Sequence, residues 1–425
     1  MVNLKNYFSQ DIFKISALTS ISTLVKVVSN LISAKLIAIY AGPMGMAVLG
    51  QLTSLSSIFL NLSTGATTSG VVKMLSEKEE DNLWQQNIIK TAFQLTFVYS
   101  TLATIILVFG SRILGRFIFG SDQFNSILVI FGFTILFYAL NLQFLSILNG
   151  LKKFKGYISL SIITSVIGLI FNIVLVVYLK TYGVLLAYVT SQSIVFIYTF
   201  YVIRTKGFIS VSIKDFLGGV DFNIVKNLSR LSLMSITSII MVPLSQVLIR
   251  NIITSNLSID STGIWEATNK ISSMYLMLIT SSLAVYFMPK ISGITDKRVL
   301  RNEIKATYKF ILPLLGLITF IIFFSRQLII QLLFTSEFAD MAIILPYQLI
   351  GDVLKMIAWV LGYVIMSRGL VKRFIFSEVV LGSISVIAVF LLVPIYGLVG
   401  SIYAHIITST LAILLYFGLV RKSFI

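Results

Sequence analysis

The residues GYISLSIITSVIGLIFNIVLVVYL, positions 156–179, decide the fold because they form 24 consecutive positions without a charged side chain. A helix rises about 1.5 Å per residue and the hydrocarbon layer of a bilayer is roughly 30 Å thick, so about 20 apolar residues cross it. The stretch lacks the alternation of lipid-facing and lumen-facing residues that marks a membrane β-strand. It therefore predicts a membrane-spanning α-helix.

The same pattern recurs along the whole chain. Hydrophobic residues make up 57% of its 425 positions and charged residues 12%, whereas soluble domains average about 45–50% and about 25%. We predict an all-α membrane protein with twelve transmembrane helices in two six-helix lobes, residues 1–203 and 223–425, joined by a linker over 204–222. The twelve apolar stretches are residues 12–40, 44–72, 88–110, 124–149, 156–179, 182–203, 228–254, 263–289, 306–324, 342–366, 374–393 and 397–420.

The distribution of positive charge predicts the orientation, because lysine and arginine favour the cytoplasmic side. With both termini in the cytoplasm, 23 of the 33 lysine and arginine residues fall in inside segments and 5 in outside loops. This ratio predicts cytoplasmic termini and an even number of spans. The outside loops near 111–123 and 325–341 are amphipathic and are expected to lie along the membrane surface.

Short motifs recur at a common spacing of about half the chain. Ser111-Arg112-Ile113-Leu114 recurs as Ser325-Arg326-Gln327-Leu328, and Phe124 and Phe338 keep the same offset of 214 residues. Tyr182-Gly183 and Tyr396-Gly397 keep it too. These matches predict two homologous halves of like orientation, an architecture that places a binding site near the midplane between the halves.

Composition excludes several kinds of chemistry. The chain has no cysteine, so disulfides, thiolate metal sites and cysteine nucleophiles are absent, and its single histidine, His405, excludes a multi-histidine metal site. We expect no cofactor. The net charge of +17 is explained by basic loops that set orientation rather than by nucleic acid. The outside loops are too short for a catalytic domain, so we expect no enzyme, and in particular no membrane polysaccharide polymerase or ligase.

Charged residues within the apolar stretches are candidates for the functional site, because a charge in the bilayer usually faces a cavity or a partner. Glu266 and Lys270 are four residues apart and share a helix face. Asp352 and Lys355, three residues apart, also share one. Either each pair neutralises itself, or the cations hold an anionic head group while an acid carries a coupling proton or sodium ion. The cationic candidates are Lys26, Lys35, Arg250, Lys270 and Lys355, and the acidic ones Asp352, Glu266 and Glu378.

Three of these candidates, and the single histidine, leave alternatives open. Lys26 has no acidic neighbour one turn away, so it needs a cavity, a partner or an anionic ligand, unless it is a structural lysine near the inner interface. Lys35 follows nine residues later on roughly the opposite side of a straight helix, and either a helix bend or snorkelling accommodates it. Glu378 is a weaker coupling candidate that also fits a place near the inner interface. His405 is more typical of a packed polar residue than of a proton relay.

Four stretches of the sequence have a familiar pattern. They are Ser22-Thr23-Leu24-Val25-Lys26 with Gly42-Pro43, Gly263-Ile264-Trp265, Tyr286 to Pro289 with Ser292, and Gln348 to Lys355 (QLIGDVLK) with Gly362-Tyr363. They resemble the Wzx-type flippases for O-antigen and enterobacterial common antigen, which are polysaccharide transporters of the MOP superfamily. The stretch around Asp352 is the most specific.

The resemblance implies a MATE-like fold of two six-helix lobes around a central cationic cavity, in a bacterial inner membrane. The implied activity is the transfer of an undecaprenyl-pyrophosphate-linked oligosaccharide, an O-antigen repeat unit of lipopolysaccharide, from the cytoplasmic to the periplasmic leaflet by alternating access. A polymerase and a chain-length regulator of the same pathway are the implied partners. Lys26, Lys35, Arg250, Asp352 and Lys355 match family positions, whereas Glu266 and Lys270 depart from the common-antigen members.

A multidrug or cation antiporter of the same superfamily is the alternative. It predicts a cavity dominated by acidic residues, whereas the net positive charge of the spans here suits an anion.

Overall fold

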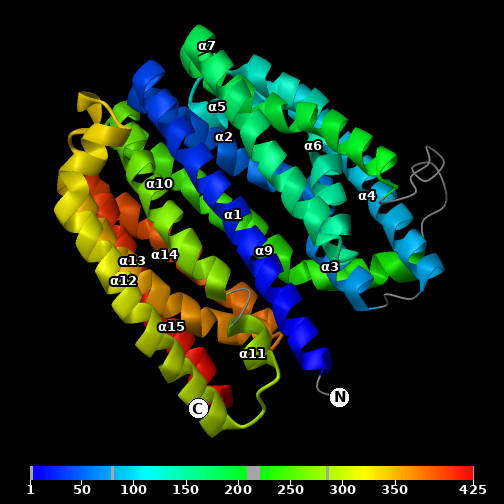
Figure 1. Ribbon diagram of the computed structural model, residues 1–425. Helices are drawn as coiled ribbons and strands as arrows, with labels where there is room; N and C mark the ends of the chain where they lie inside the picture. The colour runs from blue at the N-terminus through cyan, green and yellow to red at the C-terminus, as the bar shows by residue number, and fades with distance from the viewer. Residues whose placement is uncertain (1–2, 78–80, 208–220, 284–286, 425) are drawn as a thin grey trace. The chain divides into compact units, whose positions relative to one another are not determined.

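The chain folds into helices joined by short turns in the part that the structure describes. The computed structural model describes residues 3–77, 81–207, 221–283 and 287–424, and these contain no strand (Figure 1). The predicted all-α class is confirmed, while residues 208–220 of the predicted linker lie outside the described residues. The elements are α1 (Asn3–Tyr40), α2 (Gly42–Ser63), α3 (Thr68–Glu77), α4 (Asn82–Phe109), α5 (Ser111–Phe119), α6 (Asn125–Gly150), α7 (Phe154–Thr205), α9 (Phe222–Asn256), α10 (Ile259–Ser282), α11 (Met288–Ser292), α12 (Lys297–Leu333), η2 (Ser336–Phe338), α13 (Met341–Ser367), α14 (Val371–Tyr396) and α15 (Leu398–Phe424).

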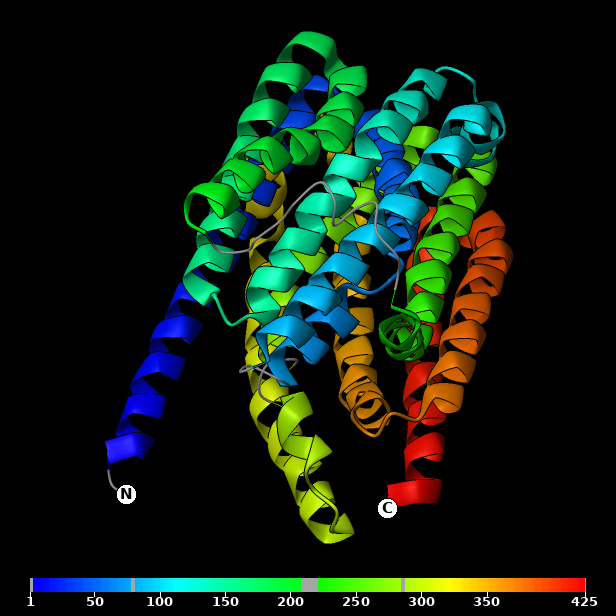
Figure 2. The ribbon, with the colours of Figure 1, turned by 90° about the vertical axis from the view of Figure 1, so that its right-hand side faces the viewer.

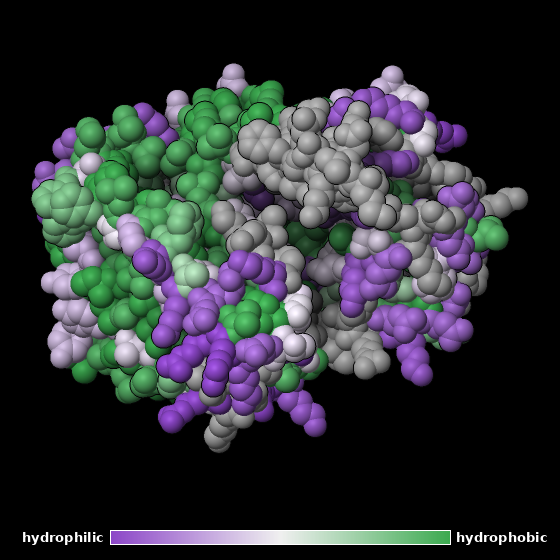
Figure 3. All heavy atoms as spheres, turned by 60° about the horizontal axis from the view of Figure 1, so that its bottom comes forward, coloured by the Kyte–Doolittle hydropathy of each residue, from purple (hydrophilic) through white to green (hydrophobic). Residues whose placement is uncertain are grey.

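Ten helices among the described residues are long and apolar enough to cross a membrane, and the protein is therefore a multi-pass membrane protein. They are α1, α2, α4, α6, α7, α9, α12, α13, α14 and α15. Large apolar side chains such as Phe109 and Ile395 are mostly exposed, as expected where lipid is the solvent. Figure 3 shows broad hydrophobic areas on the surface beside clusters of hydrophilic side chains.

Helix α7 contains a sharp break at the place where the sequence predicts two spans. It is 52 residues long, and Lys180 interrupts it with φ 49° and ψ −130°. A straight helix of that length would reach roughly 78 Å, more than twice the thickness of the hydrocarbon layer. The break therefore separates two segments that each have the length of a membrane span.

The second predicted span, 44–72, is wrong at its end. Helix α2 stops at Ser63, and α3 begins only at Thr68. Between them, Gly65 and Ala66 have φ of 61° and 52°, the left-handed conformation that ends a helix. Apolar composition continues through this turn, so hydropathy does not reveal it.

The chain divides into two compact units, and two of their three boundaries fall inside helices. One unit holds Met1–Tyr40 and Leu55–Ile236, and the other holds Ala41–Ser54 and Thr237–Ile425. The first part of α2 thus belongs with the second unit. It packs there on α9 and α10, where Pro43 lies so close to Gly263 that a Cβ at Gly263 would stand 1.9 Å from the Pro43 carbonyl oxygen.

The first unit is built around α6, which packs between α4 and α7 (Figures 1 and 2). Phe93 and Phe144 meet edge-on with ring centroids 5.0 Å apart, and Phe196 stacks on Phe144. Aromatic pairs of this geometry add to the stabilisation from buried area. They hold the three helices together.

The second unit is centred on α13, which packs against α15, α12 and α10. Gly351 makes the approach of α15 close, because a Cβ there would lie 2.3 Å from the His405 ring. This contact brings the polar face of α13 against α15 and thereby positions the candidate site.

The internal repeat is visible in the backbone. Gly397, between α14 and α15, has φ 60° and ψ −143°, nearly the conformation of Lys180. A Cβ at Gly183 would strike the Leu175 carbonyl, and one at Gly400 the Leu392 carbonyl. In the structure, Lys180 is thus the equivalent of Gly397, and Gly183 is the equivalent of Gly400. The sequence motifs predict Gly397 as the equivalent of Gly183, so the predicted alignment is shifted by three residues.

Candidate functional site

The Asp352 carboxylate is deeply buried in the second unit, with 1% of its side chain exposed. Tyr275 on α10 donates its hydroxyl to Oδ2 at 2.5 Å. Gln348, one turn earlier on α13, donates to Oδ1 at 3.2 Å, and His405 Nε2 on α15 lies 3.1 Å from the same oxygen. A buried charge is costly unless it is hydrogen-bonded, and three helices supply the groups that bond this one.

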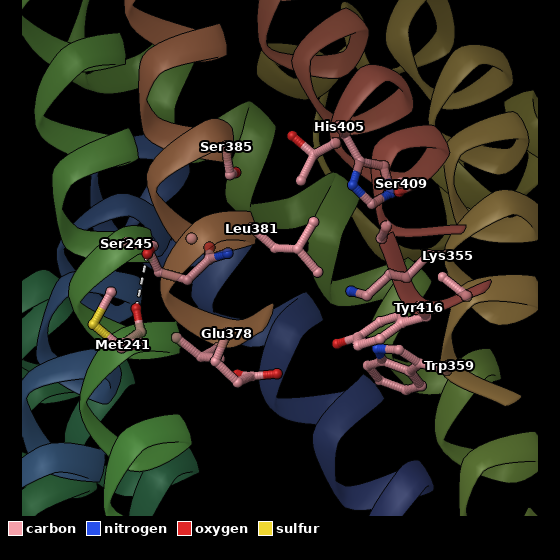
Figure 4. A pocket seen from close by; sticks show the side chains of 16 residues that line it. Met241, Ser245, Lys355, Trp359, Glu378, Leu381, Ser385, His405, Ser409 and Tyr416 are labelled. Carbon is pink, nitrogen blue, oxygen red and sulfur yellow. Dashed lines mark hydrogen bonds between the residues drawn. The ribbon is translucent and has the colours of Figure 1, made fainter. Parts of the chain in front are cut away.

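A cavity of about 190 Å³ opens beside this carboxylate within the second unit (Figure 4). Its walls come from α9, α13, α14 and α15. Lys355, Glu378 and Tyr416 direct their polar ends toward the space between them (Figure 4). His405 lines the same cavity, so its ring touches both the buried Asp352 and the open space.

Lys355 and Glu378 are the opposite charges of this cavity. The Lys355 ammonium lies 5.1 Å from the centre of the Trp359 ring, a cation–π distance, and Glu378 accepts a hydrogen bond of 3.3 Å from Ser238 on α9. The ion partner that the structure gives Asp352 is His405 and not Lys355. Lys355 lies three residues after Asp352 but does not form an ion pair with it. Its ammonium group presents a positive charge to the cavity.

Arg250 forms a second charged cluster with Glu266. Both Nε and Nη2 of Arg250 lie 2.8 Å from Glu266 Oε2, and Nη1 donates to Ser54 at 2.9 Å. The guanidinium also lies 5.7 Å from the centre of the Trp265 ring. Gly50 leaves the space for this pair, because a Cβ there would stand 2.7 Å from the Glu266 side chain.

Of the two alternatives left open for Glu266 and Lys270, the structure does not show the one in which they pair with each other. Arg250 takes Glu266, and Lys270 has no ion-pair partner within the described part of the chain. Equal spacing on one helix places two side chains on one face but leaves open which neighbouring helix offers a better partner. A planar guanidinium that binds one oxygen through two N–H groups is the stronger partner.

Lys26 and Lys35 both lie on α1, in the first unit, and both are exposed. Neither Arg250 nor Lys270 lines the cavity beside Asp352, so Lys355 is the cation of the predicted set that does. Whether these lysines and Arg250 bind substrate stays a prediction.

Four residues of the site were not predicted from the sequence. Tyr275 and Tyr416 are two of 18 tyrosines, and nothing in their spacing sets them apart. Gln348 was quoted within the family-like stretch, and its place four residues before Asp352 is the signal that it shares a face with the acid. His405 was expected to be a packed polar residue, and the structure places it against the buried carboxylate.

Together the fold and the site define a class: a multi-pass helical membrane protein with charged groups around an internal cavity, as in a transporter. Residues 49–343 match the family described as "Polysaccharide biosynthesis protein", and the chain belongs to that family. It is 26% identical over 401 residues to the protein named "Lipid III flippase" of Escherichia coli (strain K12), covering 93% of this chain and 94% of that one.

Two solved structures share the fold. An inward-facing multidrug resistance MATE family transporter of the MOP superfamily aligns with a TM-score of 0.78 at 12% identity, over 94% of this chain and 99% of its own. The lipid II flippase MurJ, in an inward closed conformation, aligns with a TM-score of 0.73 at 17% identity, over 96% of this chain and 87% of its own. The fold is therefore that of the MOP superfamily transporters.

Proposed function

We propose that the protein is a flippase that moves an undecaprenyl-pyrophosphate-linked oligosaccharide, an O-antigen repeat unit, from the cytoplasmic to the periplasmic leaflet of a bacterial inner membrane. The observation that carries this proposal is the similarity to a lipid III flippase along nearly the full length of both chains. The family match and the fold shared with a lipid II flippase support it. A protein of this kind transports its substrate and catalyses no reaction on it.

The site supports an anionic substrate in one specific way. Lys355 offers an ammonium group to an internal cavity, and within the described part of the chain no ion pair with an acidic side chain occupies it. Lysine and arginine are the natural partners of phosphate, since they make charge-assisted hydrogen bonds to its oxygens. We propose that Lys355 contacts the pyrophosphate during an alternating-access cycle, with Lys26, Lys35, Arg250 and Lys270 as further candidate contacts.

We also propose twelve spans with both termini in the cytoplasm. The two segments of α7 on either side of Lys180 count as two spans, and the 24 residues of α10 are long enough for one more. Helix α10 carries Asp260, Glu266 and Lys270, which lowers its hydropathy. The buried ion pair of Glu266 with Arg250 lowers the free-energy cost of placing α10 in a membrane.

The alternative function is that of a multidrug or cation antiporter. The acidic Glu378 in the cavity and the alignment with a multidrug MATE transporter favour it. It predicts energy-dependent efflux of small cationic dyes and no effect of gene deletion on surface polysaccharide.

Deletion of the gene in its host tests the proposed function. We expect loss of surface polysaccharide and a build-up of lipid-linked repeat units on the cytoplasmic leaflet. Complementation with Lys26→Ala or Asp352→Ala is expected to fail although both variants insert at normal levels. Normal export by both variants contradicts the site assignment, and normal surface polysaccharide in the deletion strain contradicts the function. A polymerase and a chain-length regulator are the partners to seek by cross-linking in the same strain.

A further inference from the structure

The Asp352 carboxylate accepts hydrogen bonds on both oxygens, from the hydroxyl of Tyr275 on Oδ2 and from the amide of Gln348 on Oδ1. One further partner of the carboxylate is a ring nitrogen, which can gain or lose a hydrogen.

His405 is that partner, and its geometry fixes which nitrogen is free. Nε2 lies 3.1 Å from Asp352 Oδ1, an acceptor, so Nε2 carries a hydrogen and Nδ1 is the basic atom of the neutral ring. Nδ1 makes no hydrogen bond within the described part of the chain. The His405 side chain is 22% exposed, whereas the Asp352 side chain is 1% exposed. The His405 ring lines the cavity (Figure 4).

We propose that the coupling ion is a proton, that Asp352 and His405 bind it as a pair, and that His405 takes it up from the cavity. The inference rests on the proposed function, that of an ion-coupled flippase. The proton adds to Nδ1, and the resulting imidazolium keeps its Nε2–H bond to the carboxylate. No other bond forms or breaks.

Binding a proton changes the charge of the pair from −1 to zero. A lone buried carboxylate is costly, and a neutral ion pair in the same place is less so. The change is felt by Lys355, which lies one turn from Asp352 on the same helix face. Proton binding and the charge of the cavity are thus linked through α13.

Other titratable groups surround the pair on the neighbouring helices. Helix α9 lines the cavity only with uncharged residues. Tyr308 on α12 donates to the carbonyl of Ile357 and is occupied there. The remaining groups are Tyr275 from α10, Lys355 from α13, Glu378 from α14 and Tyr416 from α15.

The single histidine of the chain makes proton binding directly measurable without any substrate. Full-length protein labelled with ¹⁵N-histidine and held in lipid nanodiscs gives the signals of a single imidazole ring by NMR. We expect those signals to change on acidification as the ring takes up a proton. In Asp352→Asn the midpoint of that change should move, because interacting groups titrate as a pair.

The matched control is Ser409→Ala. Ser409 lines the same cavity one turn after His405 but has no charge to lose, so its replacement should leave the midpoint unchanged. A signal that does not titrate, or a midpoint that Asp352→Asn leaves in place, overturns the proposal.

A transport measurement separates this proposal from the proposed function. In closed proteoliposomes, a gradient of about one pH unit should shift the distribution of lipid-linked oligosaccharide between leaflets by about tenfold per coupled proton. His405→Gln keeps an amide that donates to Asp352 but cannot hold the proton. We expect this variant to show no gradient-driven shift. A full shift in His405→Gln overturns the role of the pair, whereas failure of the wild-type protein to equilibrate the lipid overturns the proposed function instead.

Discussion

The Glu266→Gln substitution tests how the buried charges of the second unit are held. Arg250 and Glu266 are 5% and 17% exposed, and Oε2 of Glu266 accepts two N–H groups at 2.8 Å. Breaking a buried pair by removing one partner costs about 3–5 kcal/mol, because the other charge is left uncompensated. The Gln amide oxygen still accepts one N–H, so we expect the lower end, a loss of about 3 kcal/mol in the free energy of unfolding.

The control is the double variant Arg250→Met and Glu266→Met. Replacing both members of a buried pair by apolar residues is often neutral, so this variant should unfold close to the wild type. Equilibrium unfolding in mixed micelles measures both, and the fluorescence of Trp265, which contacts Arg250, reports the transition locally. A Glu266→Gln variant within about 0.5 kcal/mol of the wild type, or a double variant less stable than the single one, refutes the reasoning.

Three further predictions concern single positions. Lys180→Gly should raise the free energy of unfolding by about 1 kcal/mol, because φ 49° and ψ −130° suit glycine. Gly397→Ala should lower the free energy of unfolding, because this glycine has nearly the same backbone angles. Changes of the same sign in the two variants contradict a strained break. Gly50→Ala should lower the midpoint of thermal unfolding, since its Cβ would overlap the buried ion pair, and an unchanged midpoint argues against that packing. The hydrogen bond from Arg116 lowers the pKa of the Asp122 carboxyl. The stabilisation of α5 by this pair is therefore present at neutral pH and is lost as the pH falls below about 4 through the lowered pKa. Hydrogen exchange of α5 should show this acid loss in the wild type and not in Asp122→Asn.

The positions of the spans follow from the sequence because lipid selects for long apolar stretches, and this selection acts on each helix separately. Residues 156–179 and 374–393 were placed in this way and lie within helices. The end of α2 escaped detection because one of the two left-handed residues that end it, Ala66, has a side chain that rarely takes this conformation.

The partners of the charged residues were not predictable from spacing. Periodicity gives the face of a helix on which a residue lies, but the packing of neighbouring helices decides what meets it. Glu266 and Lys270 share a face, yet Arg250 reaches Glu266 because Gly50 lets α2 approach closely. His405 meets Asp352 for the same reason, since Gly351 brings α15 against α13.

We propose that this chain moves a pyrophosphate-linked sugar lipid between leaflets. A test reconstitutes the purified protein in vesicles with a fluorescent polyprenyl-pyrophosphate oligosaccharide and adds a quencher that reaches only the outer leaflet. We expect quenching of the lipid from both leaflets with the protein and of the outer leaflet alone without it. Equal quenching in both kinds of vesicle, from protein that transports a cationic dye in parallel, would contradict it.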